Sequence, residues 1–301
     1  MNDYCKYMSG TLVEEKWGLY IDTAGFSKVH PNQDYPKNYE HPSSHTFSWN
    51  KGRILSGYQL IYVSKGGGLF ESEFADPIEI SEGTCLFLHA GVWHRYKPNV
   101  NSGWDEYWIG FNGNYANELM KNDFFNVKYP FIKVGLSAEL LTLFHKLIET
   151  IQTAPSGYQQ ISSGITLQIL GYLYSASLTS DTDTSPIGRL IEKAKFLLQK
   201  SLEKHIDLEK MARELPMGYS SFRKEFKRLT GEPPNQFVLN LRLTRAKYLL
   251  ETTTLTINEI SEQTGFESVY YFSKLFKKRN GKSPRYYRNK TDKGVSIAGN
   301  E

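Results

Sequence analysis

The sequence predicts a two-domain α+β protein, with an antiparallel β-barrel and two following helices in its first half and an all-α domain in its second half. Three observations lead to this prediction. Short β-branched and aromatic runs, separated by glycines, lie between residues 58 and 111. Apolar residues then recur at spacings of three and four from residue 136 onward. The net charge also changes sign close to residue 186.

The first half contains three segments typical of strands: "YQLIYVSKGGGLF" at 58–70, "PIEISEGTCLFLHAGVWHRY" at 77–96 and "EYWIGF" at 106–111. Glycines interrupt them, and we expect Gly66–Gly68 to form a turn. No helical pattern is evident before residue 136. Short strands joined by glycine turns, without helices between them, indicate an antiparallel barrel or sandwich.

Two helices are predicted over residues 136–178, with a break at Pro155–Gly157. Both have wide apolar faces, which need a packing partner. The segment "TSDTDTSP" that follows has no apolar residue and ends in Pro186, so it is typical of a linker. The predicted organisation is a first domain at 1–178, a linker at 179–186, a second domain at 187–290 and a flexible tail at 291–301.

The charge is distributed unevenly along the chain. Residues 1–185 hold 13 Lys and Arg against 19 Asp and Glu, a net charge of −6. Residues 186–290 hold 22 Lys and Arg against 11 Asp and Glu, a net charge of +11. This asymmetry predicts that the second half alone meets a polyanion, although a basic domain without such a partner remains the alternative.

Composition narrows the class of protein. With 40% hydrophobic and 23% charged residues, the chain is typical of a folded globular protein. It has no apolar run of the roughly 20 residues that a membrane span needs, and its start does not resemble a secretory signal. The two cysteines, Cys5 and Cys85, do not form a disulfide framework. We therefore expect a cytoplasmic protein without a membrane partner.

The second half repeats itself. Asp207 and Thr256 correspond at an offset of 49 residues, whereas Phe222 and Phe272 correspond at an offset of 50. One extra residue is therefore expected between the two helices of the second copy. Two copies are too few for a solenoid, so a duplicated binding module is the better interpretation.

Each copy has the residue pattern of a helix-turn-helix. In the second, Thr256 and Glu259 form a capping box. Gly265 then permits the positive φ of a tight turn, and Ser268 is suited to cap the next helix. The first copy has Pro216 where the second has Gly265, so we expect its turn to be built differently.

The outward faces of the second helices hold the candidate DNA-binding residues, because the phenylalanines occupy the inward faces. Arg and Lys can read guanine in the major groove, and apolar groups can touch thymine. The helix between the copies supplies Arg242 and Arg245 as phosphate candidates. A solvated basic face is the alternative for any single lysine. The exposed candidates are Ser220, Ser221, Arg223 and Lys224 in the first copy and Val269, Tyr270 and Lys274 in the second.

Residues 187–290 resemble the DNA-binding domain of the AraC/XylS family of transcription regulators, and the stretch "RLTRAKYLLETTTLTINEISEQTGFESVYYFSKLFKKRNGKSP" carries the family signature. The resemblance implies two helix-turn-helix units, joined by one long helix, that enter successive major grooves of promoter DNA. It also makes RNA polymerase a candidate partner. The resemblance implies base-reading roles for Ser220, Arg223, Lys224, Val269, Tyr270 and Lys274.

The first half resembles the cupin-like, ligand-binding domain of the same family between Arg53 and Gly113. By similarity to the arabinose-responsive member, Tyr96, Glu106 and Trp108 fall on ligand-contacting positions, and Arg53 falls near another. Strand alternation places Glu106 and Trp108 on one face and Tyr107 on the other. The resemblance implies a small-molecule effector, with a monosaccharide as a candidate, and a homodimer formed through helices 136–178.

Two enzymatic alternatives remain open at this point. A metal-dependent cupin enzyme needs about three histidines and a carboxylate, whereas this region offers His89 and His94 without an H-x-H pair. A DNA-repair enzyme with an AraC-like tail needs a reactive cysteine, for which Cys85 is the candidate. Hydrolase, dinucleotide and phosphate-loop motifs are missing. We expect no enzymatic activity, no metal and no cofactor.

Overall fold

The computed structural model describes residues 3–36, 48–122, 124–178, 186–204 and 206–288. The chain divides into two units, Met1–Asp183 and Thr184–Glu301. The predicted linker lies outside the described residues apart from Pro186, and the predicted tail lies wholly outside them. No helix in the described ranges is long and apolar enough to cross a membrane.

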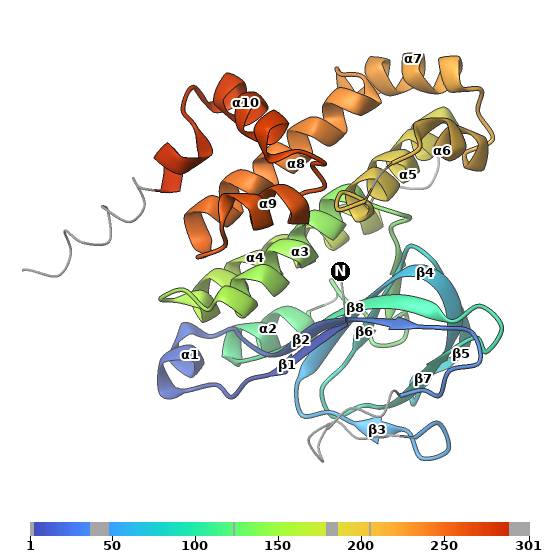
Figure 1. Ribbon diagram of the computed structural model, residues 1–301. Helices are drawn as coiled ribbons and strands as arrows, with labels where there is room; N and C mark the ends of the chain where they lie inside the picture. The colour runs from blue at the N-terminus through green and yellow to red at the C-terminus, as the bar shows by residue number, and fades with distance from the viewer. Residues whose placement is uncertain (1–2, 37–47, 123, 179–185, 205, 289–301) are drawn as a thin grey trace, which may run out of the picture. The chain divides into compact units, whose positions relative to one another are not determined.

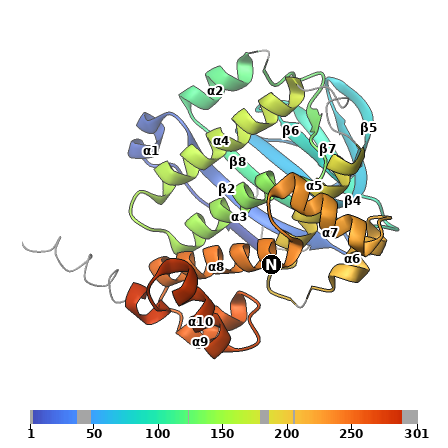
Figure 2. The ribbon, with the colours of Figure 1, turned by 90° about the horizontal axis from the view of Figure 1, so that it is seen from above.

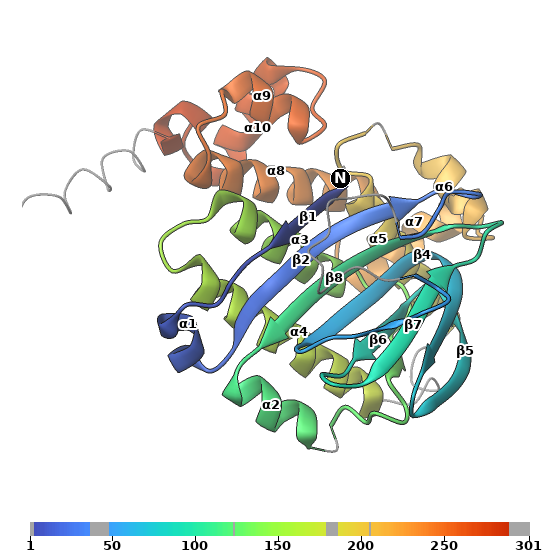
Figure 3. The ribbon, with the colours of Figure 1, turned by 90° about the horizontal axis from the view of Figure 1, so that it is seen from below.

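The first unit is built on a sheet whose neighbouring strands are all antiparallel, in the order β1-β2-β8-β4-β6-β9. Figure 3 shows β1, β2, β8 and β4 side by side. The described strands (Figure 1) are β1 (Tyr4–Tyr7), β2 (Tyr20–Val29), β3 (Arg53–Ile54), β4 (Tyr58–Ser72), β5 (Ala75–Ser81), β6 (Thr84–Leu88), β7 (Trp93–Pro98), β8 (Trp104–Asn112) and β9 (Phe131–Lys133).

The long strand β4 belongs to two parts of the sheet. Its first part pairs with β6 and β8, and its second part, from Gly67 onward, pairs with β5 and β7. The expectation that Gly66–Gly68 forms a turn is therefore wrong, because these glycines lie within the strand where it passes from one part to the other. A Cβ on Gly68 would overlap the carbonyl oxygen of Lys97 and lie 2.8 Å from the Trp104 ring. Glycine is needed here for close approach.

The two parts of the sheet enclose an apolar interior, and β8 alternates between this interior and the opposite face. Trp104 is buried in the interior and Trp108 packs against it. Tyr107 points the other way, where its ring lies 5.5 Å from that of Phe144 and its hydroxyl 3.1 Å from Nε2 of His145. The predicted alternation along this strand is confirmed.

Helices α3 (Ala138–Thr153) and α4 (Tyr158–Leu178) cover the outer face of β2 and β8 (Figure 2). They match the predicted helical region and its break. Gln159 fixes α4 to the sheet, since its side chain accepts from the backbone N–H of Ile21 at 3.2 Å and donates to the Ile21 carbonyl at 3.1 Å. Ile21 borders a bulge in β2, so the amide satisfies backbone groups beside an irregular edge.

Two helices of the first unit were not expected from the sequence. Helix α1 (Leu12–Trp17) separates β1 from β2, and α2 (Asn114–Lys121) follows β8. The expectation of strands without helices before residue 136 is therefore wrong. A signal for α1 does exist in the sequence, because Thr11 and Glu14 form a capping box at its start.

The second unit is helical and contains two helix-turn-helix pairs, α6–α7 and α9–α10, on either side of α8. Helices α6 and α9 begin 49 residues apart, whereas α7 and α10 begin 50 residues apart, which confirms the extra residue in the second copy. The described helices are α5 (Pro186–Lys200), α6 (Leu208–Glu214), α7 (Tyr219–Thr230), α8 (Pro234–Thr252), α9 (Ile257–Gln263) and α10 (Val269–Asn280).

Each helix-turn-helix has its own apolar core, and α8 contributes to both. Phe222 and Phe226 are fully buried in the first core, with Val238 of α8 beside them. Phe272 and Phe276 occupy the second, with the later part of α8. The α8 residues of the second core are Leu243, Ala246, Leu249 and Leu250.

The two turns share one hydrogen bond and differ in another. Met217 N–H donates to the Ala212 carbonyl at 2.9 Å, and its counterpart Phe266 N–H donates to the Ser261 carbonyl at 3.0 Å. Gly265, with a φ of 76°, also donates its own N–H to Glu262 at 2.9 Å. Pro216 has no N–H to donate, so the first turn is built differently, as the sequence predicts.

Candidate nucleic-acid interface and effector site

Helices α7 and α10 each bury one face and expose the other. Their buried faces hold the phenylalanines of the two cores. Ser268 caps α10, since its hydroxyl accepts from the N–H of Tyr271 at 3.4 Å, as expected. Gly231 and Gly281 end the two helices in the left-handed conformation. The outer faces of α7 and α10 are therefore fixed in orientation relative to the cores on which these helices pack.

All seven candidate DNA-binding residues of these two helices are exposed to solvent on the outer faces. Tyr270 is 78% exposed, which is unusual for a large aromatic side chain and leaves its ring available for contact. Arg223 lies with its guanidinium carbon 5.8 Å from the ring centre of Tyr219. The exposed set is Ser220, Ser221, Arg223, Lys224, Val269, Tyr270 and Lys274.

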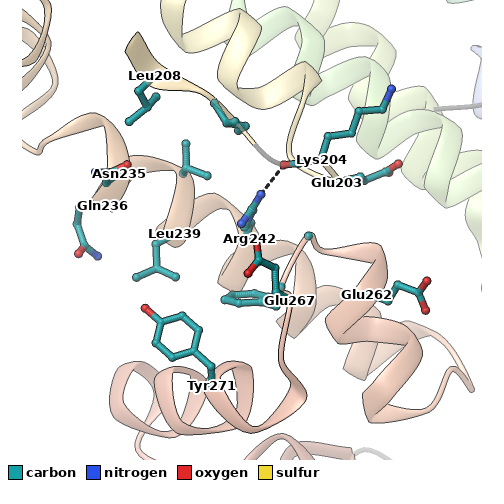
Figure 4. A pocket seen from close by; sticks show the side chains of 14 residues that line it. Glu203, Lys204, Leu208, Asn235, Gln236, Leu239, Arg242, Glu262, Glu267 and Tyr271 are labelled. Atoms are coloured by element: carbon teal, nitrogen blue, oxygen red, sulfur yellow. Dashed lines mark hydrogen bonds between the residues drawn. The ribbon is translucent and has the colours of Figure 1, made fainter. Parts of the chain in front are cut away.

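The two arginines of α8 have different surroundings. Arg242 donates from Nε to the Leu202 carbonyl at 3.0 Å and from Nη2 to the Lys204 carbonyl at 2.7 Å (Figure 4). Arg245 lies 3.5 Å from a carboxylate oxygen of Glu203. The sequence pattern placed both as phosphate contacts, but two donor groups of Arg242 are already engaged within the protein.

Three of the predicted effector residues belong to one polar group in the barrel. Arg53 donates from Nη2 to the Tyr96 hydroxyl at 2.8 Å and to Oε1 of Gln59 at 3.3 Å. Its Nε donates to Nε2 of His94 at 3.3 Å. Glu106 accepts from the Tyr35 hydroxyl at 3.1 Å.

Tyr35 joins the two ends of this group. Its ring centre lies 5.9 Å from that of Tyr96 and 5.6 Å from that of Trp104. Burial, and next the charge of Glu106, raise the pKa of the Tyr35 hydroxyl well above its usual value, so it acts as a donor. Sequence reasoning missed Tyr35, because it lies outside the strand-like runs and belongs to no motif.

Trp108, the fourth predicted residue, lies on the same face of the sheet. Its Nε1 donates to the Thr23 hydroxyl at 3.2 Å. A Cβ on Gly25 would overlap the Trp108 ring, so the indole lies directly over β2 at this glycine. Trp104 is buried, and its Nε1 has no hydrogen-bond partner in the described part of the chain. The four predicted residues therefore line one interior surface, rich in aromatic rings.

The histidines and the buried cysteine do not form a reactive centre in the described residues. No group of three or more His, Cys, Asp or Glu that could hold a metal ion occurs among these residues. His94 has its Nε2 engaged by Arg53, and its Nδ1 lies 3.0 Å from the Val92 carbonyl. Cys85 is fully buried, and burial raises the pKa of its thiol well above the usual value. A buried thiol that resists ionisation is a poor nucleophile.

Two family models match the chain. An AraC-like ligand binding domain matches residues 39–175, and a helix-turn-helix domain matches residues 211–290. The first segment includes β3 to β9, α2, α3 and most of α4, and the second runs from within α6 to beyond α10.

Relatives with similar sequences include three regulators of operons. The chain is 24% identical to the Msm operon regulatory protein of Streptococcus mutans, over 78% of this chain and 85% of that protein. It is 27% identical to the MmsAB operon regulatory protein of Pseudomonas aeruginosa, over 78% of this chain and 76% of that protein. It is 25% identical to the lactose operon transcription activator of Staphylococcus xylosus, over 76% and 83% respectively.

These matches, together with the fold, define a DNA-binding transcriptional regulator with a ligand-binding domain, and not an enzyme. The chain belongs to the AraC family. The resemblance in the sequence and the predicted two-domain α+β fold class are both confirmed.

A pH dependence follows from the position of His94. Burial, and next the charge of Arg53, lower its pKa from 6.5 to about 3. Because the unfolded chain binds the proton more readily, the contribution of His94 to stability is complete above about pH 6.5 and declines as the pH falls toward 3. At pH 5 the loss is about 2 kcal/mol relative to pH 8. We expect His94→Gln to remove this part of the difference between urea unfolding free energies at the two pH values.

His30→Gln is the matched control, because His30 is exposed. It should leave the wild-type pH dependence in place. An unchanged pH dependence in His94→Gln would show that His94 does not titrate as its burial requires.

Proposed function

We propose that the protein senses a sugar or a related polyhydroxy metabolite inside the barrel, and that this ligand changes how the basic unit binds promoter DNA. The observation that supports it most is the interior surface formed by Arg53, Tyr35, Tyr96, Glu106 and the two tryptophans. It combines hydrogen-bonding groups with aromatic faces, as small-molecule sites do.

The chemistry of this surface matches that of a sugar. Each hydroxyl both donates and accepts, so its site needs groups of both kinds. Glu106 accepts, whereas Arg53 and the indole N–H of Trp104 donate. The rings of Trp104 and Trp108 suit the apolar face of a pyranose. The relation to an activator of a lactose operon is consistent with an effector of this class.

The basic unit is proposed to bind DNA through α7 and α10, each in a major groove. Arg223 and Lys224 would read bases from the first helix, and Tyr270 and Lys274 from the second. Arg245, whose ion pair with Glu203 is long at 3.5 Å, is the better of the two α8 arginines for a phosphate. RNA polymerase as a partner and the cytoplasm as the place of action stay predictions.

We further propose a homodimer that pairs through α4. The exposed side of this helix holds Ile161 at 44% and Leu167 at 36% exposure. Gly164 and Gly171 lie on the same side, with open space where a Cβ would stand. Small residues between apolar ones allow two helices to approach closely, and a two-fold dimer would read two half-sites.

For DNA, Arg223→Ala should lose discrimination at one or two base pairs, at a cost of about 1–3 kcal/mol, because it removes a base contact. Arg245→Ala should weaken all sequences alike and reduce the salt dependence. Titrations with a selected operator and with random DNA at two salt concentrations distinguish the two. Equal losses on both DNAs from Arg223→Ala would contradict its base-reading role.

For the ligand, calorimetry with monosaccharides and lactose should find a sugar that binds. Trp108→Ala should then lower the affinity about tenfold or more, because it removes an aromatic face of the site. Trp17→Ala is the control, since Trp17 is 60% exposed on α1 and should leave binding unchanged. Unchanged affinity in Trp108→Ala would remove this residue from the site, and no heat from any sugar would refute the ligand class.

For the dimer, sedimentation equilibrium at micromolar concentration should give twice the chain mass. Leu167→Glu should shift this toward one chain, because a charge in an apolar helix contact is costly. Leu12→Glu is the control, since Leu12 is 74% exposed on α1. A wild-type mass equal to one chain would exclude the proposed dimer.

A further inference from the structure

Three segments that are distant in the sequence meet around Arg242, in the middle of α8. Its guanidinium donates to the carbonyls of Leu202 and Lys204, which follow the end of α5 in the first half of the unit. Both carbonyls lie beyond the regular helix, where such groups need an outside partner. Arg242 supplies it from a helix 40 residues further along the chain.

The turn of the second helix-turn-helix closes on the same point. A Cβ on Gly265 would overlap the Leu202 carbonyl oxygen and lie 2.8 Å from Nη2 of Arg242. The Arg242 guanidinium carbon lies 6.0 Å from the ring centre of Phe266, which belongs to the second core. Figure 4 shows the Glu267 carboxylate beside Arg242. Burial lowers the pKa of the Arg242 guanidinium, and the charge of Glu267 opposes this shift.

This arrangement affects how the two helix-turn-helix pairs are positioned relative to each other. The helices of the first pair pack on one another and α7 on α8, whereas α9 packs on α8 and on α10. A groove of about 570 Å³, lined among others by Leu208, Arg242, Gly265 and Tyr271, separates the two pairs. Two bodies joined through one helix can twist about it, unless a contact across the groove prevents this.

We propose that Arg242 is a positioning residue that fixes the rotation and separation of α7 relative to α10, and so makes the protein select DNA by the spacing of its two recognition elements. One added base pair moves the second element by about 3.4 Å and rotates it by about 35°. If α7 and α10 are held rigidly, this change removes contacts with the DNA. If they are held loosely, they can move to fit the new spacing. The inference depends on DNA binding by both helices.

The test uses the full chain and an operator selected from random DNA by the wild type. Variants of this operator carry one base pair more or less between the two elements. The wild type should lose about tenfold or more in affinity for the altered spacings, as for the loss of a base contact. Arg242→Met keeps the aliphatic part of the side chain but not its hydrogen-bond donors. The affinity of this variant should fall by less than about threefold when the spacing is altered.

Arg245→Met is the matched control, one turn further along α8. It should bind more weakly but keep the wild-type ratio between spacings. An unchanged ratio in Arg242→Met would overturn the proposal. Should Arg242→Met melt below the assay temperature, Arg242→Lys replaces it, since a lysine keeps the charge but cannot bridge two carbonyls from a planar fork.

A second measurement needs no DNA. Spin labels at Lys227→Cys and Lys278→Cys in a Cys5→Ser background report the distance between α7 and α10. Dilution with unlabelled chain isolates pairs within one chain. The distance distribution should broaden in Arg242→Met and stay narrow in Arg245→Met. Equal widths in the two variants would refute the positioning role of Arg242. Broadening in Arg242→Met, together with a wild type that binds no specific DNA, would refute the proposed function and leave the positioning role standing.

Discussion

The double use of α8 is the constraint on which the DNA-binding unit depends. A helix that packs into one core needs one apolar stripe, but α8 contributes Val238 to the first core and Leu243 to the second. The contacts to the two cores alternate along the middle of α8, since Leu241 packs against the first core and Leu239 against the second. Arg242 lies within this stretch.

The barrel depends in a similar way on a single element, since β4 pairs with strands in both parts of the sheet. Its glycines let the strand pass from one part of the sheet to the other. They also let Trp104 pack where a side chain would otherwise stand. The enclosed interior can then hold Arg53 and Glu106, because each has partners that offset the cost of removing a charge from water. A ligand that enters must supply equivalent hydrogen bonds, and this requirement favours polyhydroxy compounds over apolar ones.

Exposure on a helix face does not by itself assign a role to a basic residue. Arg242 and Arg245 lie on one helix, three residues apart, and sequence reasoning could not separate them. The carbonyls of Leu202 and Lys204 distinguish the two, and nothing local to α8 predicts their position. Tyr35 is a similar case, because its pairing with Glu106 joins positions 71 residues apart.

The sequence by itself determined the features that local rules govern. The capping box at Thr256, the turn at Gly265 and the offset of 49 and 50 residues follow from short-range geometry, and so does the alternation along β8. Tertiary structure alone decided the course of β4 through Gly66–Gly68, the group around Arg53 and the engagement of Arg242. In each of these, a side chain or backbone meets a partner far along the chain, and neither periodicity nor spacing records such a meeting.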